Sequence, residues 1–460
     1  MKREEIKEKL YNKYIRPTLE ERPLNIGIEI EMPVVNLSGT AADHAIAQAA
    51  AAAARKEFGF HEDRRDENGI CYSATRPDNG DNLSFDCSYN NLEISFGKER
   101  DLNILDRRFR QYTGFLNEEL GRTDHILTGM GTNPGFQVNR SDFIPSERYR
   151  MLERYLLKSR VWNVPMYFHP YPGFAAFASA SQVQLDVHGS RLIPTITAQS
   201  LLEPLKAVLF SNSLLPSEPD LLCVRDLFWE NSTHGINPHN IGMYESRMDS
   251  IDDLLEYICT PSIFCTERDG RYINFLPVPI TDYLEADQIS GEYYQDGTYH
   301  PIVFHPEAED LAYLRTYKFE DLTFRGTLEY RSSCCQPFRD AMTVAAFHLG
   351  LHECPEQVIE LMREDHSIYH HGFSCGELRR IMNRRSWPEF VDRKGLRRLL
   401  LQVLDLADRN LRGRGLGEEK YLLPLYDRAD TLTSPGRVVA DALDRGETMR
   451  TMTLQYARPD

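Results

Sequence analysis

Eight residues near the start of the chain, Asn25 to Met32 (NIGIEIEM), alternate strictly between apolar and polar positions. In an extended strand this alternation places three isoleucines on one face, and Glu29 and Glu31 together on the other. Adjacent carboxylates destabilise a strand unless a cation lies between them, and a divalent metal held by oxygen ligands supplies one. An exposed acidic face of an antiparallel sheet accounts for the same pattern. The alternation therefore predicts a strand and leaves both explanations of the paired acids open.

The overall composition limits the classes of partner. The chain has 460 residues, of which 41% are hydrophobic, enough for a substantial core. Its net charge of -16 argues against non-specific binding to nucleic acid or anionic membranes, which depends on clustered Lys and Arg. No apolar run approaches the roughly 20 residues that span a bilayer. We therefore expect a cytoplasmic protein, monomeric or homodimeric, with no nucleic-acid or membrane partner.

The cysteines do not indicate a zinc site or a disulfide framework. There are nine of them, an odd number, without a CxxC pair or a regular spacing. The adjacent Cys334 and Cys335 are therefore predicted to be buried thiols.

Strand-forming segments gather in the first three quarters of the chain, and helical segments dominate after about Phe338. Further strands are predicted at Gly69–Ala74, Asn82–Asp86, Asn91–Phe96, Gln182–Val187 and Gly326–Ser332. Helices are predicted at Ala41–Arg55, Asp106–Leu120, Ser146–Ser159, Thr197–Asn212 and Ile251–Cys259. This order favours an α+β fold on a largely antiparallel sheet over a doubly wound α/β fold. We expect a domain over residues 1–345 with a helical C-terminal region, 346–460, packed on it.

A second pair of acids lies in the segment DNLSFDCSYNNLEISFG, which is typical of two short strands joined by the turn 88–91. A hairpin brings Asp86 and Glu93 near each other, with apolar side chains on its opposite face. A hairpin tip with exposed acids is the alternative.

The third polar strand is SQVQLDV, where Gln182, Gln184 and Asp186 share one face. Amides beside carboxylates suit a site that orients a polar ligand or completes a metal sphere through a carbonyl oxygen. A half-exposed strand gives the same alternation.

The fourth polar strand is RGTLEYRSS, in which Arg325, Thr327, Glu329 and Arg331 share one face. Glu329 can hold a cation while Arg331 faces a phosphate or carboxylate, or the two can form a cross-strand salt bridge. Five carboxylates on one sheet face imply several divalent cations, and several such ions imply a bound polyphosphate.

These motifs, in this order, resemble glutamate-cysteine ligases of the plant and proteobacterial type. PSERYRMLERYL (145–156) is similar to that family's Pro-x-x-Arg-Tyr-x-x-Met-x-x-Tyr stretch, with Pro145, Arg148, Tyr149 and Tyr155 as they stand here and Met151 one place early. LLEPLKAVLFSNSLLPSE is similar to a family helix that ends in an Ala-Asn-Ser type of turn. The resemblance covers roughly residues 20 to 345.

The resemblance implies a glutamine-synthetase-like fold, in which a curved antiparallel sheet holds ATP, Mg²⁺ or Mn²⁺ and an acidic amino acid. The expected metal-binding residues are Glu29, Glu31, Asp86, Glu93, Gln182 and Glu329. The expected substrate-binding residues are Gln184, Arg148, Tyr149, Arg225, Trp229 and Asn240. Arg331 and Arg325 are expected to bind ATP, and Arg331 and Glu31 to be catalytic, because a planar cation stabilises charge on the transferred phosphoryl group.

One loop departs from the family pattern. Where relatives have a Trp-Thr-Asp-x-Asp-Pro-Asp-Arg-x-Gly loop, this chain has FWENSTHGINPHNIG, with Asn240 in the place of the family Arg. The specificity for the amino acid substrate is therefore open. Arg225 lies just upstream and can compensate for the missing positive charge. His234 and His239 in the same loop either bind a ligand carboxylate or lie on the surface.

The implied reaction is carboxylate activation. The γ-carboxylate of glutamate or an analogue attacks ATP to give an acyl phosphate, and the amino group of cysteine or of another amino acid or amine then displaces phosphate. Both glutathione biosynthesis and a specialised pathway with a non-cysteine acceptor fit this reaction. A metal-dependent hydrolase and a catalytically silent ATP-binding relative are the rivals from other classes.

Overall fold

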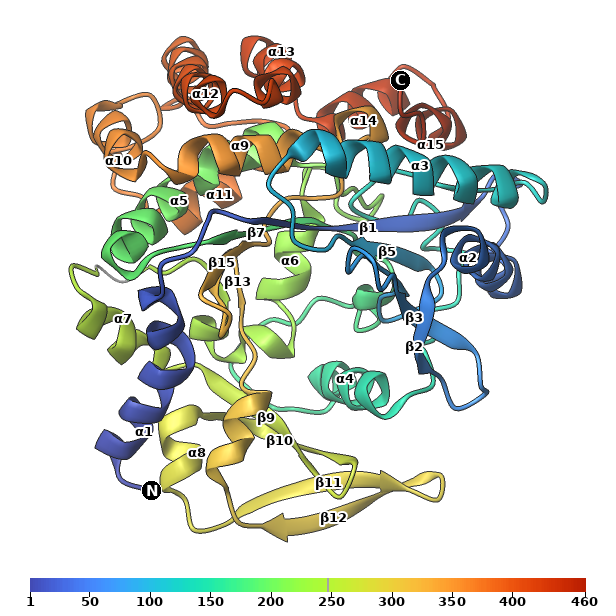
Figure 1. Cartoon of the computed structure of the whole chain (residues 1–460), viewed down its shortest axis with the longest axis vertical. Helices are drawn as coiled ribbons and strands as arrows, with labels where there is room; N and C mark the ends of the chain where they lie inside the picture. The colour runs from blue at the N-terminus through green and yellow to red at the C-terminus, as the bar shows by residue number, and fades with distance from the viewer. Residues whose placement is uncertain (246–247) are drawn as a thin grey trace.

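The structure is a computed structural model that describes residues 1–245 and 248–460 (Figure 1). It is a mixed fold with a large antiparallel sheet and helices around it, so this part of the predicted fold class is confirmed. None of the helices in the described chain combines the length and the apolar character needed to cross a membrane.

The main sheet is antiparallel and has nine strands within the described chain. Its strands are β1 (Ile26–Asn36), β2 (His61–Arg65), β3 (Cys71–Thr75), β4 (Asn82–Phe85), β5 (Asn91–Ser95), β6 (His125–Leu127), β7 (Ser181–Asp186), β14 (Glu320–Leu322) and β15 (Thr327–Tyr330). Their order is β14-β15-β7-β1-β5-β4-β3-β2, and β6 pairs with the end of β1. The predicted strands all belong to this sheet, and the predicted hairpin is β4–β5.

A second sheet lies apart from the first, at the bottom of Figure 1. It has four antiparallel strands, β9 (Ser262–Arg268), β10 (Arg271–Pro279), β11 (Ile289–Gln295) and β12 (Thr298–Phe304). A two-stranded parallel pair joins β8 (Ile241–Gly242) to β13 (Tyr317–Lys318). The sequence interpretation did not include this second sheet.

The helices of the first three quarters are α1 (Arg3–Leu10), α2 (His44–Phe58), α3 (Leu102–Gly121), α4 (Glu147–Leu157), α5 (Gly189–Phe210), α6 (Val224–Glu230), α7 (Ile251–Ile258) and α8 (Ile280–Glu285). Of these, α2, α3 and α5 lie near the main sheet, whereas α1, α7 and α8 lie on the side of the second sheet (Figure 1). Three starts differ from the prediction by three residues or more, because local caps set them. Asp43 accepts from the backbone N–H of Ala45 to start α2, Asp101 accepts from that of Asn103 to start α3, and His188 accepts from that of Ser190 to start α5.

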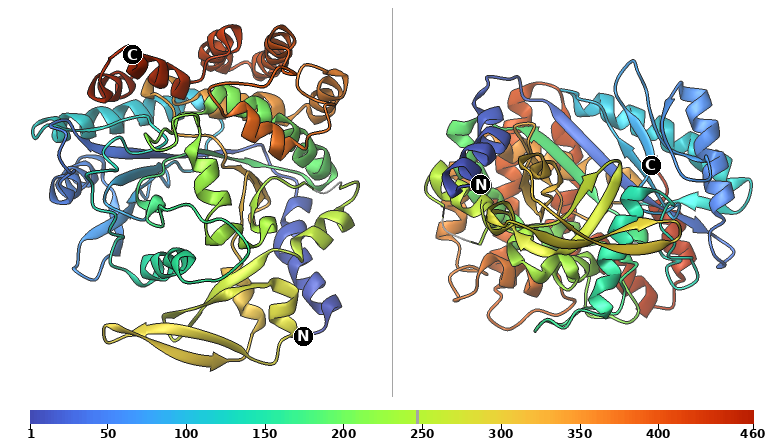
Figure 2. Two further views of the ribbon diagram at one scale, coloured as in Figure 1. Left: turned by 180° about the vertical axis from the view of Figure 1, so that it is seen from behind. Right: turned by 90° about the horizontal axis from the view of Figure 1, so that it is seen from below.

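The C-terminal part of the described chain is wholly helical after β15. Its helices are α9 (Thr343–His352), α10 (Pro355–Glu364), α11 (Cys375–Met382), α12 (Arg393–Arg414), α13 (Leu423–Thr431), α14 (Pro435–Asp444) and α15 (Met449–Tyr456). Figure 2 shows these helices on the side of the main sheet that faces away from β9–β12. The apolar face of the sheet packs toward them, with Ile28, Leu185 and Leu328 at most 2% exposed. The opposite, polar face of the main sheet carries the candidate functional site.

Candidate active site

The four polar strands predicted from the sequence lie side by side, in the order β15-β7-β1-β5. Glu31 on β1 lies opposite Glu93 on β5, and Glu29 on β1 lies opposite Gln182 on β7. Because cross-strand partners point to the same face, the register brings the polar sides of all four strands together. The apolar sides of the same strands are buried.

Three carboxylates form the tightest acidic cluster of the described residues. One oxygen from each of Glu31, Asp86 and Glu93 lies within 4.8 Å of the others. Gln182 Nε2 donates to Glu31 at 2.9 Å, and the backbone N–H of Ala180 donates to its other oxygen at 2.7 Å. The carbonyl oxygen of Gln182 is buried and has no hydrogen-bond partner. Clustered carboxylate oxygens beside an unpaired amide oxygen fit the donor set of a hard divalent cation.

A second acidic group lies one strand away, around Gln184. Its Nε2 donates to an oxygen of Glu29 and to an oxygen of Glu329, each at 3.1 Å. The amide therefore lies between these two carboxylates and holds them apart. Arg325 donates to the Gln184 carbonyl oxygen at 2.7 Å. Arg331 donates to Glu329 at 2.9 Å, so these two residues form an ion pair along one chain segment and not the cross-strand salt bridge considered from the sequence.

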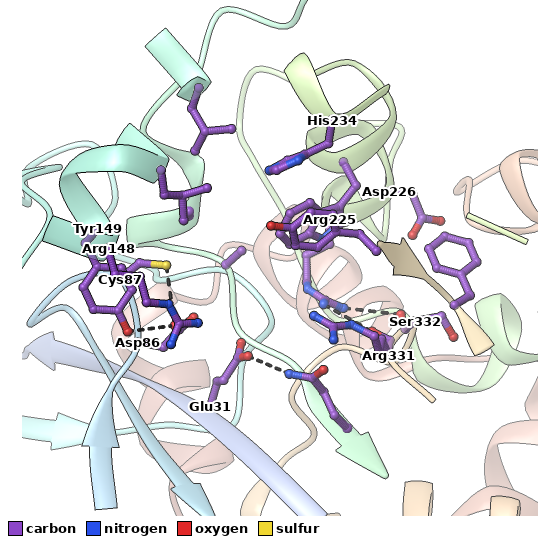
Figure 3. A pocket seen from close by; sticks show the side chains of 18 residues that line it. Glu31, Asp86, Cys87, Arg148, Tyr149, Arg225, Asp226, His234, Arg331 and Ser332 are labelled. Atoms are coloured by element: carbon purple, nitrogen blue, oxygen red, sulfur yellow. Dashed lines mark hydrogen bonds between the residues drawn. The ribbon is translucent and has the colours of Figure 1, made fainter. Parts of the chain in front are cut away.

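A cleft with two compartments opens on this polar face. The wide compartment holds about 710 Å³ and is lined by acids from β1, β5 and β15 and by Arg side chains from other segments, Arg64, Arg148, Arg315, Arg325 and Arg331. The narrow compartment holds about 140 Å³ and is shown in Figure 3. The residues that line both are Glu31, Asp86, Arg148, Tyr149, Gln182, Tyr317 and Arg331. The acidic cluster therefore lies at the junction of the two compartments.

Helix α6 and the loop after it supply much of the narrow compartment. Arg225 donates to the backbone oxygens of Ser332 and Ser333 at 3.3 and 3.1 Å, and its buried Nε has no partner. The ring of Trp229 stacks on that of Tyr317 with 4.8 Å between their centroids. Arg225, Asp226 and Arg331 lie around the same space in Figure 3.

His234 lies in the wall of the narrow compartment and not on the surface. It is 2% exposed, and neither ring nitrogen has a hydrogen-bond partner in the described chain. Burial lowers the pKa of His234 to about 3, so the ring is neutral at physiological pH. A neutral, unpaired imidazole facing a cavity can accept or donate one hydrogen bond to a ligand.

A buried ion network holds α6 in place from behind. Arg379 on α11 pairs with Asp226 at 2.9 Å and with Glu203 on α5 at 2.6 Å. Ser332, directly after the end of β15, donates to Glu203 at 3.0 Å. The helical C-terminal region therefore positions the cleft through a charged contact, although it does not line the cleft.

Two predicted substrate-binding residues do not line the cleft. The side chain of Gln184 points toward Glu29 and Glu329, the two acids between which it lies. Asn240 is 3% exposed, and its amide clamps the backbone of Ser262 on β9, donating at 2.7 Å and accepting at 2.6 Å. The prediction of a substrate contact for Asn240 is therefore corrected: its amide is already paired within the fold. His239 packs on Tyr257, with 4.9 Å between ring centroids, outside both compartments.

The sequence interpretation missed a set of lining residues on the segment 315–321. Arg315, Tyr317, Phe319 and Asp321 line one or both compartments. Arg315 presents a buried Nε without a partner. The alternation of the segment RTYKFED was a usable signal, because a spacing of two places all four on one side of an extended chain.

The crowding of acids changes their protonation. Burial, followed by the neighbouring carboxylates, raises the pKa of Glu29, Glu31 and Glu93 to about 8 each. Burial also raises the pKa of Asp321 to about 6. At neutral pH the metal-free cleft therefore holds protons that an unfolded chain has released.

This protonation predicts how the stability of the metal-free protein depends on pH. Between about pH 4.5 and 8 the folded state binds more protons than the unfolded state, so the free energy of unfolding falls as pH rises. We expect Tm in a chelating buffer to drop from pH 5.5 to pH 8.5, as measured by differential scanning calorimetry. The triple variant Glu29→Gln, Glu31→Gln, Glu93→Gln should show a clearly smaller drop. Equal drops in both proteins would contradict the raised pKa values.

No protein-family model and no curated protein matches this chain. A bifunctional glutathione synthetase from Pasteurella multocida has a similar structure, with a TM-score of 0.44 and 11% identity over 98% of this chain. The chain spans about half, 52%, of that protein. Glutamate-cysteine ligase from Francisella tularensis in complex with AMP is similar with a TM-score of 0.44 and 12% identity, covering 96% of this chain and 89% of that one. Glutamate-cysteine ligase is also the family that the sequence motifs resemble.

Proposed function

We propose that this protein is an ATP-dependent ligase that joins the γ-carboxylate of glutamate, or of an analogue, to an amine through an acyl phosphate. The observation that carries the proposal is the acidic cluster Glu31, Asp86 and Glu93 at the junction of a wide and a narrow compartment. A nucleoside triphosphate suits the wide, polar compartment. A small amino acid suits the narrow one, and the two meet where the carboxylates gather.

Glu29, Glu31, Asp86, Glu93, Gln182 and Glu329 are the residues proposed to hold Mg²⁺ or Mn²⁺. When bound, these ions offset the repulsion between a carboxylate and a triphosphate. The unpaired Gln182 oxygen and the raised pKa values support this role, since a group of acids without a counter-charge is unfavourable as it stands. Hydrogen bonds to Glu31 from Gln182 and from the Ala180 backbone fix the carboxylate that lines both compartments.

Arginines supply the fixed positive charge that an anionic substrate pair needs. Arg331 lines both compartments and is held by Glu329, which suits it to the transferred phosphoryl group. Arg315 and Arg325 line the wide compartment and are proposed to contact ATP. Arg148 and Arg225 line the narrow compartment, and each is suited to the carboxylate of an amino acid.

The acceptor amine is proposed to lie against the aromatic side of the narrow compartment, formed by Tyr149, Trp229, His234 and Tyr317. This wall fits cysteine or a larger amino acid or amine. Because Asn240 does not line the cleft, its difference from the family Arg no longer bears on acceptor choice through a direct contact. A glutamine-synthetase-like curvature of the sheet, a domain boundary at residue 345, a cytoplasmic location and a monomeric or homodimeric state remain proposals.

The test is release of ADP in the presence of Mg²⁺, ATP and glutamate, with a panel of twenty amino acids and small amines as acceptors. We expect ADP and a γ-glutamyl product in equal amounts with at least one acceptor. Substrate cleavage without ATP would favour the metal-dependent hydrolase, and nucleotide binding without ADP release would favour the silent relative.

Removal of the divalent metal is expected to abolish ligation. Excess chelator should reduce the rate at least about 100-fold, because the acidic cluster otherwise repels the triphosphate. Adding Mg²⁺ or Mn²⁺ beyond the chelator should restore the rate, and NaCl at the same ionic strength, which should not restore it, is the control. A product formed at full rate in excess chelator would refute the role of the acids.

A further inference from the structure

A second cavity lies beside the narrow compartment, along the adjacent face of α4. It holds about 390 Å³. Leu152 and Leu156 of α4 line the narrow compartment, whereas Glu153 and Leu157 line this cavity. The residues that line the cavity and those that line the two compartments of the cleft do not overlap. The cavity is therefore a separate space, and the proposed ligase reaction does not use it.

Five aromatic residues contribute to its wall. They are Phe136, Tyr171, Phe174, Phe177 and Phe228. The rings of Phe174 and Phe228 stack with 5.2 Å between centroids, and those of Phe136 and Phe177 meet edge to face at 6.4 Å. Such a wall favours a ligand with an apolar body, and the faces of the rings attract a cation.

Glu153 is the one acid in the lining. No hydrogen bond or ion pair joins its carboxylate to any of the residues that the structure describes. Burial, followed by the nearby charge of Asp142, raises the pKa of Glu153. A half-buried carboxylate without a partner gains most from a ligand that brings a positive charge. Arg160 also lines the cavity, but it is exposed to water, which screens its charge.

Two further polar groups in the lining lack a partner. Thr132 is 5% exposed, and its buried Oγ1 makes no hydrogen bond within the described chain. Asn139 uses its Oδ1 to accept from the backbone of Ala42, but its buried Nδ2 has no partner. Unpaired buried polar atoms are rare, and around a cavity of this size they indicate the polar contacts of a ligand.

We propose that this cavity binds a small primary amine with an aromatic or branched aliphatic body, its ammonium group held by Glu153 and Thr132. The site is linked to the cleft by contact, since the ring of Phe174 meets that of Trp229 edge to face at 5.1 Å. Trp229 lines the narrow compartment. The proposal goes beyond the ligase function and stands whether or not that function is correct.

Isothermal titration calorimetry of the full chain at pH 8 with phenethylamine tests the site. We expect saturable binding of one equivalent, and none by 3-phenylpropionate, which has the same body with a carboxylate in place of the amine. Glu153→Gln keeps the shape of the side chain and should weaken binding at least about tenfold, because the ion pair is lost. Glu360→Gln on α10 is the matched control for an exposed glutamate and should bind as the wild type does.

Two variants locate the ligand. Thr132→Val has nearly the same volume and should weaken binding by roughly three- to tenfold through one lost hydrogen bond. Glu31→Gln removes an acid of the neighbouring cleft and should leave the affinity unchanged. Unchanged affinity in both Glu153→Gln and Thr132→Val, a loss of binding in Glu31→Gln alone, or equal binding of 3-phenylpropionate would each overturn the proposal. Absence of binding by phenethylamine would do so as well.

Discussion

Glu31→Gln is expected to lower kcat for ligation at least about 100-fold while leaving the fold intact. The reason lies in the position of Glu31, which lines both compartments and shares the acidic cluster with Asp86 and Glu93. The amide removes one negative charge from the proposed metal shell. Steady-state ADP release at saturating ATP measures the effect.

The local hydrogen bonds allow this substitution without a change of fold. The new amide oxygen can still accept from the backbone N–H of Ala180, and the new amide nitrogen then faces Gln182. Rotation of the Gln182 amide by about 180° turns its now unpaired oxygen toward that nitrogen and restores the bond. The amide is neutral at every pH, so its burial among the other acids does not require the uptake of a proton. We therefore expect a Tm no lower than that of the wild type.

Glu21→Gln is the matched control, because the side chain of Glu21 is 93% exposed and lies outside the cleft. It should leave kcat unchanged. An unaltered rate in Glu31→Gln with ATP still bound would mean that the acidic face of β1 has no catalytic role.

Arg331→Lys is expected to reduce kcat/KM by more than about tenfold, although the positive charge is kept. A guanidinium can donate to Glu329 and to a phosphoryl group at the same time through different N–H groups, whereas a lysine ammonium is a compact charge with a different reach. Both compartments meet at Arg331, so a misplaced cation affects the transfer itself. Initial rates at varied ATP and glutamate separate kcat from KM.

Arg339→Lys provides the control, since the Arg339 side chain is 55% exposed and makes only a loose 3.7 Å contact with its neighbour Asp340. A change in kcat/KM of less than about threefold for Arg331→Lys corresponds to about 0.65 kcal/mol. An effect that small would leave Arg331 with only the structural salt bridge to Glu329.

The polar strands were predictable because their signal is local. A period of two assigns each side chain to a face without knowledge of the partner strand, so the paired acids of β1 and the apolar faces beneath them followed from the sequence. The hairpin of Asp86 and Glu93 was also local, since a turn of a few residues joins its strands. Helix starts were less predictable, because α5 begins at a His188 cap and contains Pro194 inside the helix.

The cleft as a whole was not predictable to the same extent. His234 and Asn240 lie six residues apart in one loop, yet one lines the narrow compartment and the other clamps Ser262. Nothing in their local spacing distinguishes the two, since the difference arises from where β9 packs against the loop. The segment 315–321 likewise became part of the site because β13 pairs with β8, a contact between residues far apart in the chain.

The sequence by itself determined which residues share a face of each strand, and hence that five carboxylates and two amides point away from the core. The tertiary structure decided that these faces meet, through the register that sets Glu31 opposite Glu93 and Glu29 opposite Gln182. It also decided that aromatic side chains line the narrow compartment of the cleft and that a second cavity lies along the adjacent face of α4. The physical reason is that the face on which a side chain lies depends on backbone geometry over a few residues. Whether several faces meet depends on packing between segments that are tens to hundreds of residues apart.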